Sequence, residues 1–184
     1  MRRIGEVTVR LATALDPPRL PAVEDAAGEM FREFGMPEIA EMPASEVAEL
    51  DAARRSGLLW VADDRDTGPV GFAMAEAFSG SLHLAELSVR PSHGRRGLGS
   101  ALVQCVVEAA AHRGDSEVTL STFVHVPWNA PYYRRLGFVD VAPDTLPGDL
   151  FAVRQREAEI GLDLELRVIM RRDLVPGSGT SRST

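Results

Sequence analysis

The residues best suited to chemistry lie in one glycine-rich stretch, Pro-Ser-His-Gly-Arg-Arg-Gly-Leu-Gly-Ser at positions 91–100. This stretch follows an apolar run at 82–89 and precedes a helical pattern at 98–112. A turn that joins a strand to a helix leaves backbone N–H groups without partners at the helix start, and the helix dipole adds positive potential there. The sequence therefore predicts an anion-binding turn at 91–100.

Two glycines and two arginines in this turn favour a diphosphate as the anion. Gly97 and Gly99 have no Cβ, so the backbone can close on a bulky group, and Arg95 and Arg96 add positive charge. Two familiar nucleotide loops do not fit. The chain has no lysine for the Walker sequence, and the spacing Gly94-x-x-Gly97-x-Gly99 differs from the dinucleotide fingerprint Gly-x-Gly-x-x-Gly.

A second block of functional residue types runs from 127 to 138, Pro-Trp-Asn-Ala-Pro-Tyr-Tyr-Arg-Arg-Leu-Gly-Phe. Together the two blocks resemble the GCN5-related N-acetyltransferase (GNAT) family. The first is similar to the pyrophosphate loop Gln/Arg-x-x-Gly-x-Gly/Ala, with Gly94 in the Gln/Arg position, and the second to the segment Asn…Tyr-x-x-x-Gly-Phe. The resemblance covers roughly residues 5–173, and 58–139 is its most specific part.

The resemblance implies both a fold and an activity. The fold is α/β, with a mixed, mostly antiparallel central sheet of about six to seven strands flanked by helices on both faces, the acyl-CoA N-acyltransferase fold. The activity is acetyl-CoA-dependent N-acetylation, in which an acetyl group moves directly to a primary amine of a small molecule in a ternary complex. Two alternatives stay open. One is a protein N-terminal acetyltransferase, and the other is a catalytically silent CoA-binding sensor, which Gly94 in the Gln/Arg position keeps in play.

Coenzyme-binding residues follow from the same resemblance. The backbone of Leu87 and Val89 is expected to pair with the pantetheine arm. Asn129 either hydrogen-bonds the pantetheine or caps the following helix, and the sequence favours neither role. The loop residues expected to hold the pyrophosphate are Arg95, Arg96, Gly97, Leu98, Gly99 and Ser100.

Tyr133 is the expected general acid. It stands four residues before the glycine of Gly-Phe, the position of the family's tyrosine. A phenol of pKa ~10 is a plausible proton donor to a thiolate whose thiol has a pKa of ~8.5–9. The neighbouring Tyr132 is the fallback, and a core position in a short helix is the alternative interpretation of Tyr133.

His83 and Glu86 are the candidates for the base that takes a proton from the amine. The resemblance implies a His or Glu in this strand, and an imidazole of pKa ~6.5 suits base work at neutral pH. The two residues are three apart, so a regular strand directs them to opposite faces unless a bulge intervenes. Structural roles for both, and a water relay without a dedicated base, also stay open.

Acceptor recognition is expected at residues 30–45 and 142–160, which flank the site in the implied fold. Met36 and Met42 lie in a proline-rich loop and are candidate pocket residues. Trp128 is a candidate wall of the same pocket, or else packs on the neighbouring strand.

Composition predicts one soluble domain at 1–175, followed by a disordered tail at 176–184 rich in Gly, Ser and Thr. The chain has 184 residues, of which 45% are hydrophobic and 26% charged, ordinary globular usage. No apolar run approaches a membrane span and no signal peptide is evident, so the expected location is cytoplasmic.

Charge and cysteine content argue against nucleic-acid binding and against cysteine-based catalysis. A net charge of −7 argues against nucleic-acid binding, which calls for a basic face. The single cysteine, Cys105, cannot form an intramolecular disulfide, and its place inside a helical pattern argues against an acetyl-carrying nucleophile. No ligand spacing indicates a metal site. A homodimer is compatible with the implied fold, although nothing in the sequence requires one.

The periodicity of apolar residues and the turn signals between them predict the elements that carry these residues. The expected strands are 7–11, 58–62, 69–78, 81–89, 118–124, 138–141 and 167–171, and the expected helices are 20–34, 46–55, 98–112, 130–136 and 151–160.

Overall fold

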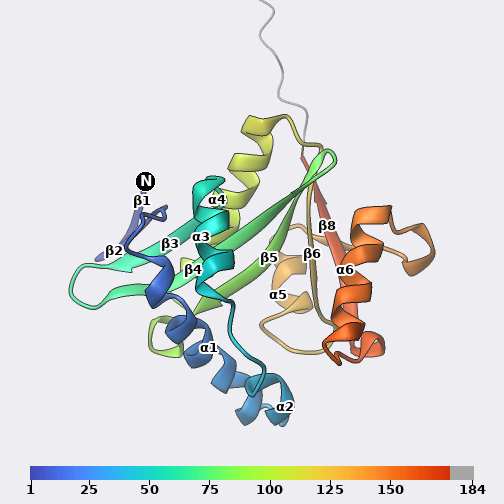
Figure 1. Cartoon of the computed structure of the whole chain (residues 1–184), viewed down its shortest axis with the longest axis horizontal. Coiled ribbons are helices and arrows are strands. Elements are labelled where there is room, and N and C mark those ends of the chain that lie inside the picture. Colours follow the sequence, from blue (N-terminus) through green and yellow to red (C-terminus); the bar gives the residue numbers. More distant parts are fainter. Residues whose placement is uncertain (175–184) are drawn as a thin grey trace, which may run out of the picture. The chain divides into compact units, whose positions relative to one another are not determined.

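The computed structural model describes residues 1–174, which cluster into two compact units. The first unit comprises Met1–Glu76 and Leu84–Val106, and the second comprises Ala77–His83 and the described chain from Val107 onward. Two antiparallel strands of the chain contribute to both units, β4 (Gly68–Phe78) and β5 (Ser81–Val89), which Figure 1 draws in green.

The sheet of the first unit has the strand order β1-β2-β3-β4-β5. Its first three strands are β1 (Arg2–Ile4), β2 (Val7–Leu11) and β3 (Leu59–Asp64). The pairs β1–β2, β2–β3 and β3–β4 are antiparallel, and a register shift between Ala62 and Asp63 interrupts the last pair. Strand β1 was not expected, because three residues with two adjacent arginines show no alternation of apolar and polar side chains.

Three helices of the first unit lie between β2 and β3 in the sequence. They are α1 (Pro21–Glu33), α2 (Pro37–Ala40) and α3 (Val47–Arg55), and a 3₁₀ turn, η1 (Pro17–Arg19), precedes them. Helix α2 replaces the loop that the proline-rich sequence predicted. Pro37 occupies the first turn of α2, where proline is tolerated because the N–H that it lacks has no partner inside the helix.

One cluster of buried side chains joins these helices to the strands. It contains Leu20, Val23, Leu50, Leu59, Val61, Phe72 and Met74, each at most 4% exposed. Because α1 and its N-cap Leu20, α3, β3 and β4 all contribute to it, burial of this cluster holds the first unit together.

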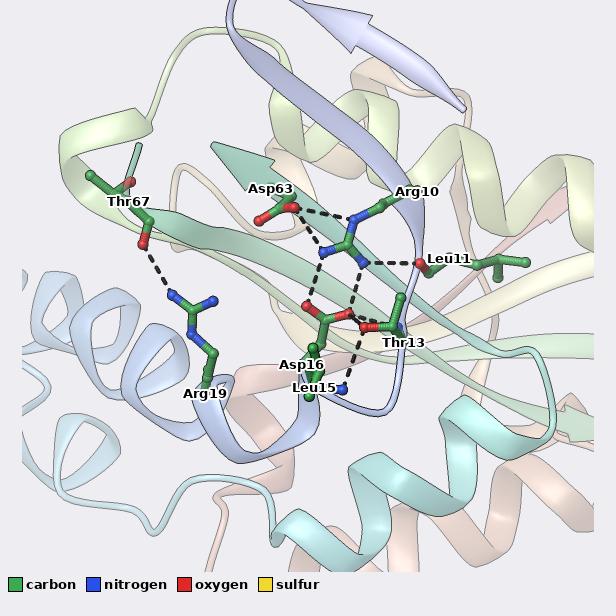
Figure 2. Close-up of polar contacts among 8 residues, drawn as sticks. All are labelled: Arg10, Leu11, Thr13, Leu15, Asp16, Arg19, Asp63 and Thr67. Carbon is green, nitrogen blue, oxygen red and sulfur yellow. Dashed lines mark hydrogen bonds and ion pairs between the residues drawn. The ribbon is translucent and has the colours of Figure 1, made fainter. Parts of the chain in front are cut away.

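A partly buried ion cluster holds the chain between β2 and α1 against the sheet (Figure 2). The Arg10 guanidinium on β2 donates to both carboxylate oxygens of Asp16, at 2.7 and 3.0 Å, and to Asp63 on β3, at 2.8 Å. The backbone N–H and the hydroxyl of Thr13 also donate to Asp16, which is 2% exposed. Burial alone would raise the pKa of Asp16, but the bonds from Arg10 and Thr13 outweigh it and hold that pKa below its usual value.

The second unit contains β6 (Glu117–Phe123), β7 (Val139–Asp140) and β8 (Arg167–Asp173). Strand β8 lies between the other two and is antiparallel to both. The helices of this unit are α5 (Ala130–Arg135) and α6 (Gly148–Glu159), together with the end of α4 (Leu98–Arg113), which begins in the first unit.

An apolar cluster and a buried ion cluster fix α6 against β8. Leu150 and Val153 pack with Ile169. The Glu157 carboxylate, 6% exposed, accepts from Arg167 at 2.6 Å and from Arg154 at 3.4 Å. Glu157 is therefore paired, as a buried carboxylate must be.

The expected fold class is confirmed. The chain is a mixed α/β protein whose strands pair mostly antiparallel, with eight strands among residues 1–174 rather than six or seven. The chain clusters into two compact units, and the single domain expected at 1–175 stays a prediction. The predicted tail at 176–184 lies outside the described residues. No helix within the described part has the length and apolar character needed to cross a membrane.

Candidate functional site

The predicted anion-binding turn lies in the first unit, between β5 and α4. A 3₁₀ turn, η2 (Pro91–His93), leads into Gly94, and α4 begins at Leu98, whose side chain is buried. Gly97 has a φ of 82°, a conformation that side chains with a Cβ rarely adopt, and no atom lies within 4 Å of where its Cβ would stand. The turn is thus open beside Gly97 and leads directly into the N-terminus of α4, the part of a helix that favours anions.

The two arginines of the turn differ in their surroundings. Arg96 donates to the backbone carbonyl of Ser92 at 3.3 Å, so its side chain bridges the turn itself. Arg95 is exposed and has a φ of 58°, the only positive φ of a non-glycine residue among residues 1–174. The sequence assigned both arginines the same role and carried no signal for this difference.

His93 connects the turn to the end of β3. Its Nδ1 lies 3.0 Å from the Ser92 hydroxyl, and its Nε2 lies 3.9 Å from Asp64 Oδ2. The other carboxylate oxygen of Asp64 accepts three bonds from Asp66 and Thr67, and these bonds lower the pKa of Asp64. These contacts give His93 a structural role in the turn.

Strand β5 carries the remaining predicted residues of the first unit. Leu87 and Val89 are half-buried. The Ser88 hydroxyl donates to Glu86 Oε1 at 2.7 Å, a partner that the sequence analysis did not identify. On β4, a Cβ at Gly71 would stand 2.9 Å from the Ser88 carbonyl oxygen, so the close approach of β4 and β5 requires glycine there.

His83, on the first half of β5, belongs to the second unit and is 4% exposed. Its Nδ1 lies 3.0 Å from the Thr119 hydroxyl on β6, and its ring stacks on Phe78 at 5.1 Å between centroids. Burial lowers the pKa of His83 to about 3, and the positive charges of Arg156 and Arg167 act in the same direction. The imidazole is therefore neutral at pH 7.

Tyr133 lies on α5 and is 8% exposed. Its ring packs edge-to-face with two other rings, that of Phe138 at 5.7 Å and that of Tyr132 at 5.4 Å between centroids. Arg135 lies over the Tyr132 ring, with 5.8 Å from its guanidinium carbon to the ring centroid. These contacts fix the orientation of the Tyr133 ring, whereas Tyr132 is half-buried.

Asn129 precedes α5 but does not cap it with its side chain. The cap role, one of the two roles expected for Asn129, is therefore wrong, because the amide does not bond the first turn of the helix. Its Nδ2 is buried and has no hydrogen-bond partner among the described residues. A buried amide of this kind costs free energy unless a further group accepts from it. Trp128, beside it, is half-buried.

The two candidate pocket methionines and the single cysteine lie in the first unit. Met36 and Met42 are half-buried and stand on either side of α2. Cys105 is half-buried on α4. No group of three or more His, Cys, Asp or Glu side chains in residues 1–174 is arranged to hold a metal ion.

The predicted residues therefore divide between the units. The first unit holds Met36, Met42, Glu86, Leu87, Val89 and the loop from Arg95 to Ser100. The second holds His83, Trp128, Asn129 and Tyr133. His83 and Glu86, the two candidate bases, have separate polar partners, Thr119 and Ser88.

A family comparison matches the larger part of the chain. A model of the acetyltransferase (GNAT) family matches residues 21–138, well over half of the sequence. The match spans both motifs on which the resemblance was based, the turn at 91–100 and the block at 127–138.

Solved structures of low identity share the fold. N-acetylglutamate synthase from Neisseria gonorrhoeae, complexed with coenzyme A and N-acetyl-glutamate, is 19% identical with a TM-score of 0.68 over 92% of this chain. The match covers 35% of that enzyme, so the chain spans about a third of its length. PaiA N-acetyltransferase from Thermoplasma acidophilum, in complex with coenzyme A, is 16% identical with a TM-score of 0.62, over 91% of this chain and 99% of that one.

A third similar structure is the ribosomal-protein-S18-alanine N-acetyltransferase from Escherichia coli. It is 16% identical with a TM-score of 0.59, and the match covers 97% of this chain and 99% of that one.

Proposed function

The chain belongs to the acetyltransferase (GNAT) family, and we propose that it transfers the acetyl group of acetyl-CoA directly to a primary amine of a small molecule in a ternary complex. Acetyl-CoA-dependent N-acetylation is the activity of the family. The acceptor, the direct transfer and the roles of individual residues are the parts that we propose.

The observation that carries this function is the turn between β5 and α4. Its positive φ at Gly97, the open space beside that residue and the N-terminus of α4 suit a bulky diphosphate such as that of coenzyme A. Arg96 supports the turn through its bond to the Ser92 carbonyl. We assign the pyrophosphate to the backbone N–H groups from Gly97 to Ser100.

The buried amide of Asn129 also fits coenzyme A. Its Nδ2 has no partner among the described residues, and the pantetheine arm carries amide carbonyls that accept such a bond. Leu87 and Val89 provide backbone groups on β5 for the same arm. When bound, the coenzyme supplies the acetyl thioester on which the amine acts.

We propose that Glu86, rather than His83, receives the proton of the acceptor amine, directly or through water. His83 is a weak proton acceptor because burial and two arginines lower its pKa to about 3. Glu86 is half-buried, and its bond from Ser88 orients the carboxylate. In the transfer, the amine nitrogen bonds to the acetyl carbon, the carbon–sulfur bond breaks, and Glu86 takes the proton lost by the amine.

The thiolate that leaves must gain a proton, and we assign this proton to the hydroxyl of Tyr133. Packing against Phe138 and Tyr132 restricts the ring to one orientation, which a general acid needs. The position of Tyr133 in the sequence block at 127–138 supports the same role.

We further propose that Met36, Met42 and Trp128 contact the acceptor. All three are half-buried, so each has surface left for a ligand. Methionines adapt to ligands of different shape, which suits a pocket that selects a small amine by its apolar part.

The experiment that tests this function measures acetyl transfer to pooled primary amines. Amino acids, amino sugars, polyamines and amine-bearing antibiotics are incubated with the protein and acetyl-CoA, and mass spectrometry identifies any acetylated product. We expect one pool to yield a product heavier by one acetyl group.

Peptides with free N-termini form a separate pool in the same experiment. If the peptides are acetylated faster than every small amine, the small-molecule proposal is wrong. If coenzyme A binds and no pool is acetylated, the proposal of catalysis is wrong and a CoA-binding sensor takes its place.

A further inference from the structure

One face of β6, in the second unit, carries polar side chains that the proposed transfer does not use. Thr119, Ser121 and Phe123 are spaced two apart on this strand, so their side chains point to the same face. The His83 imidazole bonds the Thr119 hydroxyl at 3.0 Å. Arg167 on β8 donates to the Ser121 hydroxyl oxygen at 3.3 Å, and its guanidinium carbon lies 4.6 Å from the centroid of the Phe123 ring. His83 and Arg167 therefore lie on the same face of β6.

The contact between His83 and Thr119 determines which imidazole nitrogen carries the proton. Thr119 is fully buried, and among the described residues its hydroxyl has one partner, Nδ1 of His83. If Nδ1 carried the proton, the hydroxyl would accept it and its own proton would lack an acceptor, which costs free energy at a buried position. The hydroxyl therefore donates to Nδ1, and the neutral imidazole carries its proton on Nε2.

The Nε2–H group of His83 is a donor without an acceptor in residues 1–174. Stacking on Phe78 fixes the plane of the ring and hence the direction of this donor. Within the described residues, Nδ2 of Asn129 is the one fully enclosed side-chain nitrogen or oxygen without a partner. Nε2 of His83 thus keeps a small accessible surface, through which a ligand can reach it.

Two further donors lie on this face of β6. The Ser121 hydroxyl oxygen accepts from Arg167, so its own proton is available to another acceptor. Arg167 uses Nε and Nη2 for Glu157 and Ser121, and its Nη1 has no partner in the described part of the chain. An imidazole, a hydroxyl and a guanidinium thus each offer one donor on the same face.

The charge around these donors is positive. Arg154 and Arg167 both pair with Glu157, so two guanidinium groups share one carboxylate. The positive charges of Arg156 and Arg167 also act on His83 and oppose its protonation. Donors in positive surroundings favour a ligand group that is negative and has several acceptor lone pairs, as a carboxylate does.

We propose that His83, Ser121 and Arg167 bind a carboxylate of the acceptor, so that this chain acetylates an amino acid or another amine that carries a carboxylate. This inference rests on the proposed function, because it names the chemical class of the acceptor. It gives His83 the role of a fixed hydrogen-bond donor, which suits a neutral imidazole. A carboxylate fits better than a phosphate, because it is planar and its single negative charge matches two arginines that share one glutamate.

The test compares each amino acid with its carboxamide, which keeps the α-amine and the side chain and lacks only the carboxylate. The ratio of kcat/KM for acetyl transfer to the two compounds is measured for the wild type and its variants. Phosphoethanolamine is included as the phosphate-bearing amine. We expect the wild type to favour the amino acid over its carboxamide by at least about tenfold, because the carboxamide brings no charge to the three donors.

Two variants each remove one donor. The side chain of His83→Asn can still pair with the Thr119 hydroxyl but does not reach the position of Nε2, and Ser121→Ala removes the hydroxyl. We expect each to lower the ratio of amino acid to carboxamide at least about fivefold, mainly through a higher KM for the amino acid, since the carboxylate is bound equally before and during transfer. A purely structural effect would lower kcat/KM for both compounds together and leave the ratio unchanged.

Ser116→Ala is the control for Ser121→Ala. Ser116 lies in the same unit, and its hydroxyl donates to the Gly80 carbonyl at 3.1 Å rather than to any group of this face. We expect it to leave the ratio at the value of the wild type.

The outcomes separate this inference from the proposed function. If the wild type acetylates carboxamides or phosphoethanolamine as well as amino acids, the acceptor class is wrong and the proposed function stands. If the preference for a carboxylate exists but neither His83→Asn nor Ser121→Ala reduces it, the assignment to this face is wrong. If no small amine is acetylated, the proposed function fails and the inference fails with it.

Discussion

Tyr133 is the residue on which the proposed proton transfer to sulfur depends. Replacing it with phenylalanine removes the hydroxyl and keeps the ring that packs against Phe138. We expect Tyr133→Phe to lower kcat roughly 100-fold or more, with the affinity for acetyl-CoA nearly unchanged, because only the proton donor is lost. Steady-state kinetics and calorimetry on the same preparation measure the two effects.

Tyr132→Phe is the matched control, because the two tyrosines are adjacent and their rings are in contact. We expect it to retain most of the turnover. A loss of turnover in Tyr132→Phe together with a normal rate in Tyr133→Phe would transfer the role of acid to Tyr132.

His83 gives a second prediction, for stability against pH. Its folded pKa of about 3 lies below the unfolded value of ~6.5, so between these values the unfolded chain binds more protons. Stability should therefore fall as pH decreases from ~6.5 toward 3, by at most about 1.4 kcal/mol per pH unit from this residue. Urea unfolding at pH 7, 6 and 5 measures the trend.

His83→Asn is the comparison for this prediction, because the asparagine amide can still pair with the Thr119 hydroxyl but does not titrate. Its stability should change less between pH 7 and 5 than that of the wild type. Equal pH dependence in both proteins would contradict a buried, neutral His83.

For single residues, the sequence predicted which residue types stand at which motif positions better than it predicted the burial and the contacts of those residues. Tyr133 and Asn129 were proposed as site residues from their spacing, because a motif specifies order along the chain, and their roles stay predictions. The burial of His83 was not predictable, because it depends on long-range packing. The left-handed backbone of Arg95 was not predictable either, because arginine has no preference for a positive φ. The bond from Ser88 to Glu86 had only a weak signal, two polar residues two apart on one strand.

Among the elements, the turn before α4 supports a test of the phosphate site. Gly97→Val places a branched side chain at a φ of 82°, which it cannot hold without strain, so the turn must rearrange. We expect binding of coenzyme A to weaken by at least about tenfold while circular dichroism stays that of a folded protein.

Gly114→Val is a control of the same kind at the end of α4. Gly114 has a φ of 80°, and like Gly97 it has no atom within 4 Å of where its Cβ would stand. Both variants thus introduce similar backbone strain. If they reduce the affinity for coenzyme A equally, the turn at 91–100 is not the phosphate site.

The ion cluster that joins β2, β3 and the turn before η1 makes a third prediction (Figure 2). Asp16→Asn leaves the Arg10 guanidinium without its closest carboxylate, and we expect a loss of about 3 kcal/mol in unfolding free energy at pH 7. The folded pKa of Asp16 is lowered, so its contribution is present above pH ~3.9 and is lost as pH falls through the folded pKa.

Denaturant unfolding at pH 7 and pH 3 measures this effect. The difference between Asp16→Asn and the wild type should shrink at the lower pH. Asp51→Asn serves as the control, because it removes a half-buried carboxylate beside Arg54 and Arg55, whereas Asp16 is buried, and it should cost much less at either pH. A difference for Asp16→Asn that is independent of pH would contradict the role assigned to its charge.

The elements themselves were largely predictable from periodicity. The hairpin of β4 and β5 and the helix α4 follow the expected bounds within one or two residues, because their apolar patterns are long. Strand β1 and helix α2 were missed. Each has three or four residues, too few for a period to show, and each is stabilised by contact with a neighbouring element.

For the molecule as a whole, the family is shown and the acceptor is proposed. The match over residues 21–138 includes both motifs, so the chemistry of acetyl transfer does not depend on any single residue assignment. The net charge of −7 and the lack of a described metal site do not select the acceptor. The homodimer and the cytoplasmic location stay predictions from the sequence.

The most direct test of the central claim is the stoichiometry of the reaction. Free thiol and acetylated amine are quantified together after incubation of the wild type with acetyl-CoA and one small primary amine. The account predicts that both products appear in equal amounts, and that Gly97→Val forms neither at a comparable rate. Thiol release without acetylated amine, or no turnover on any small amine despite tight binding of coenzyme A, would contradict it.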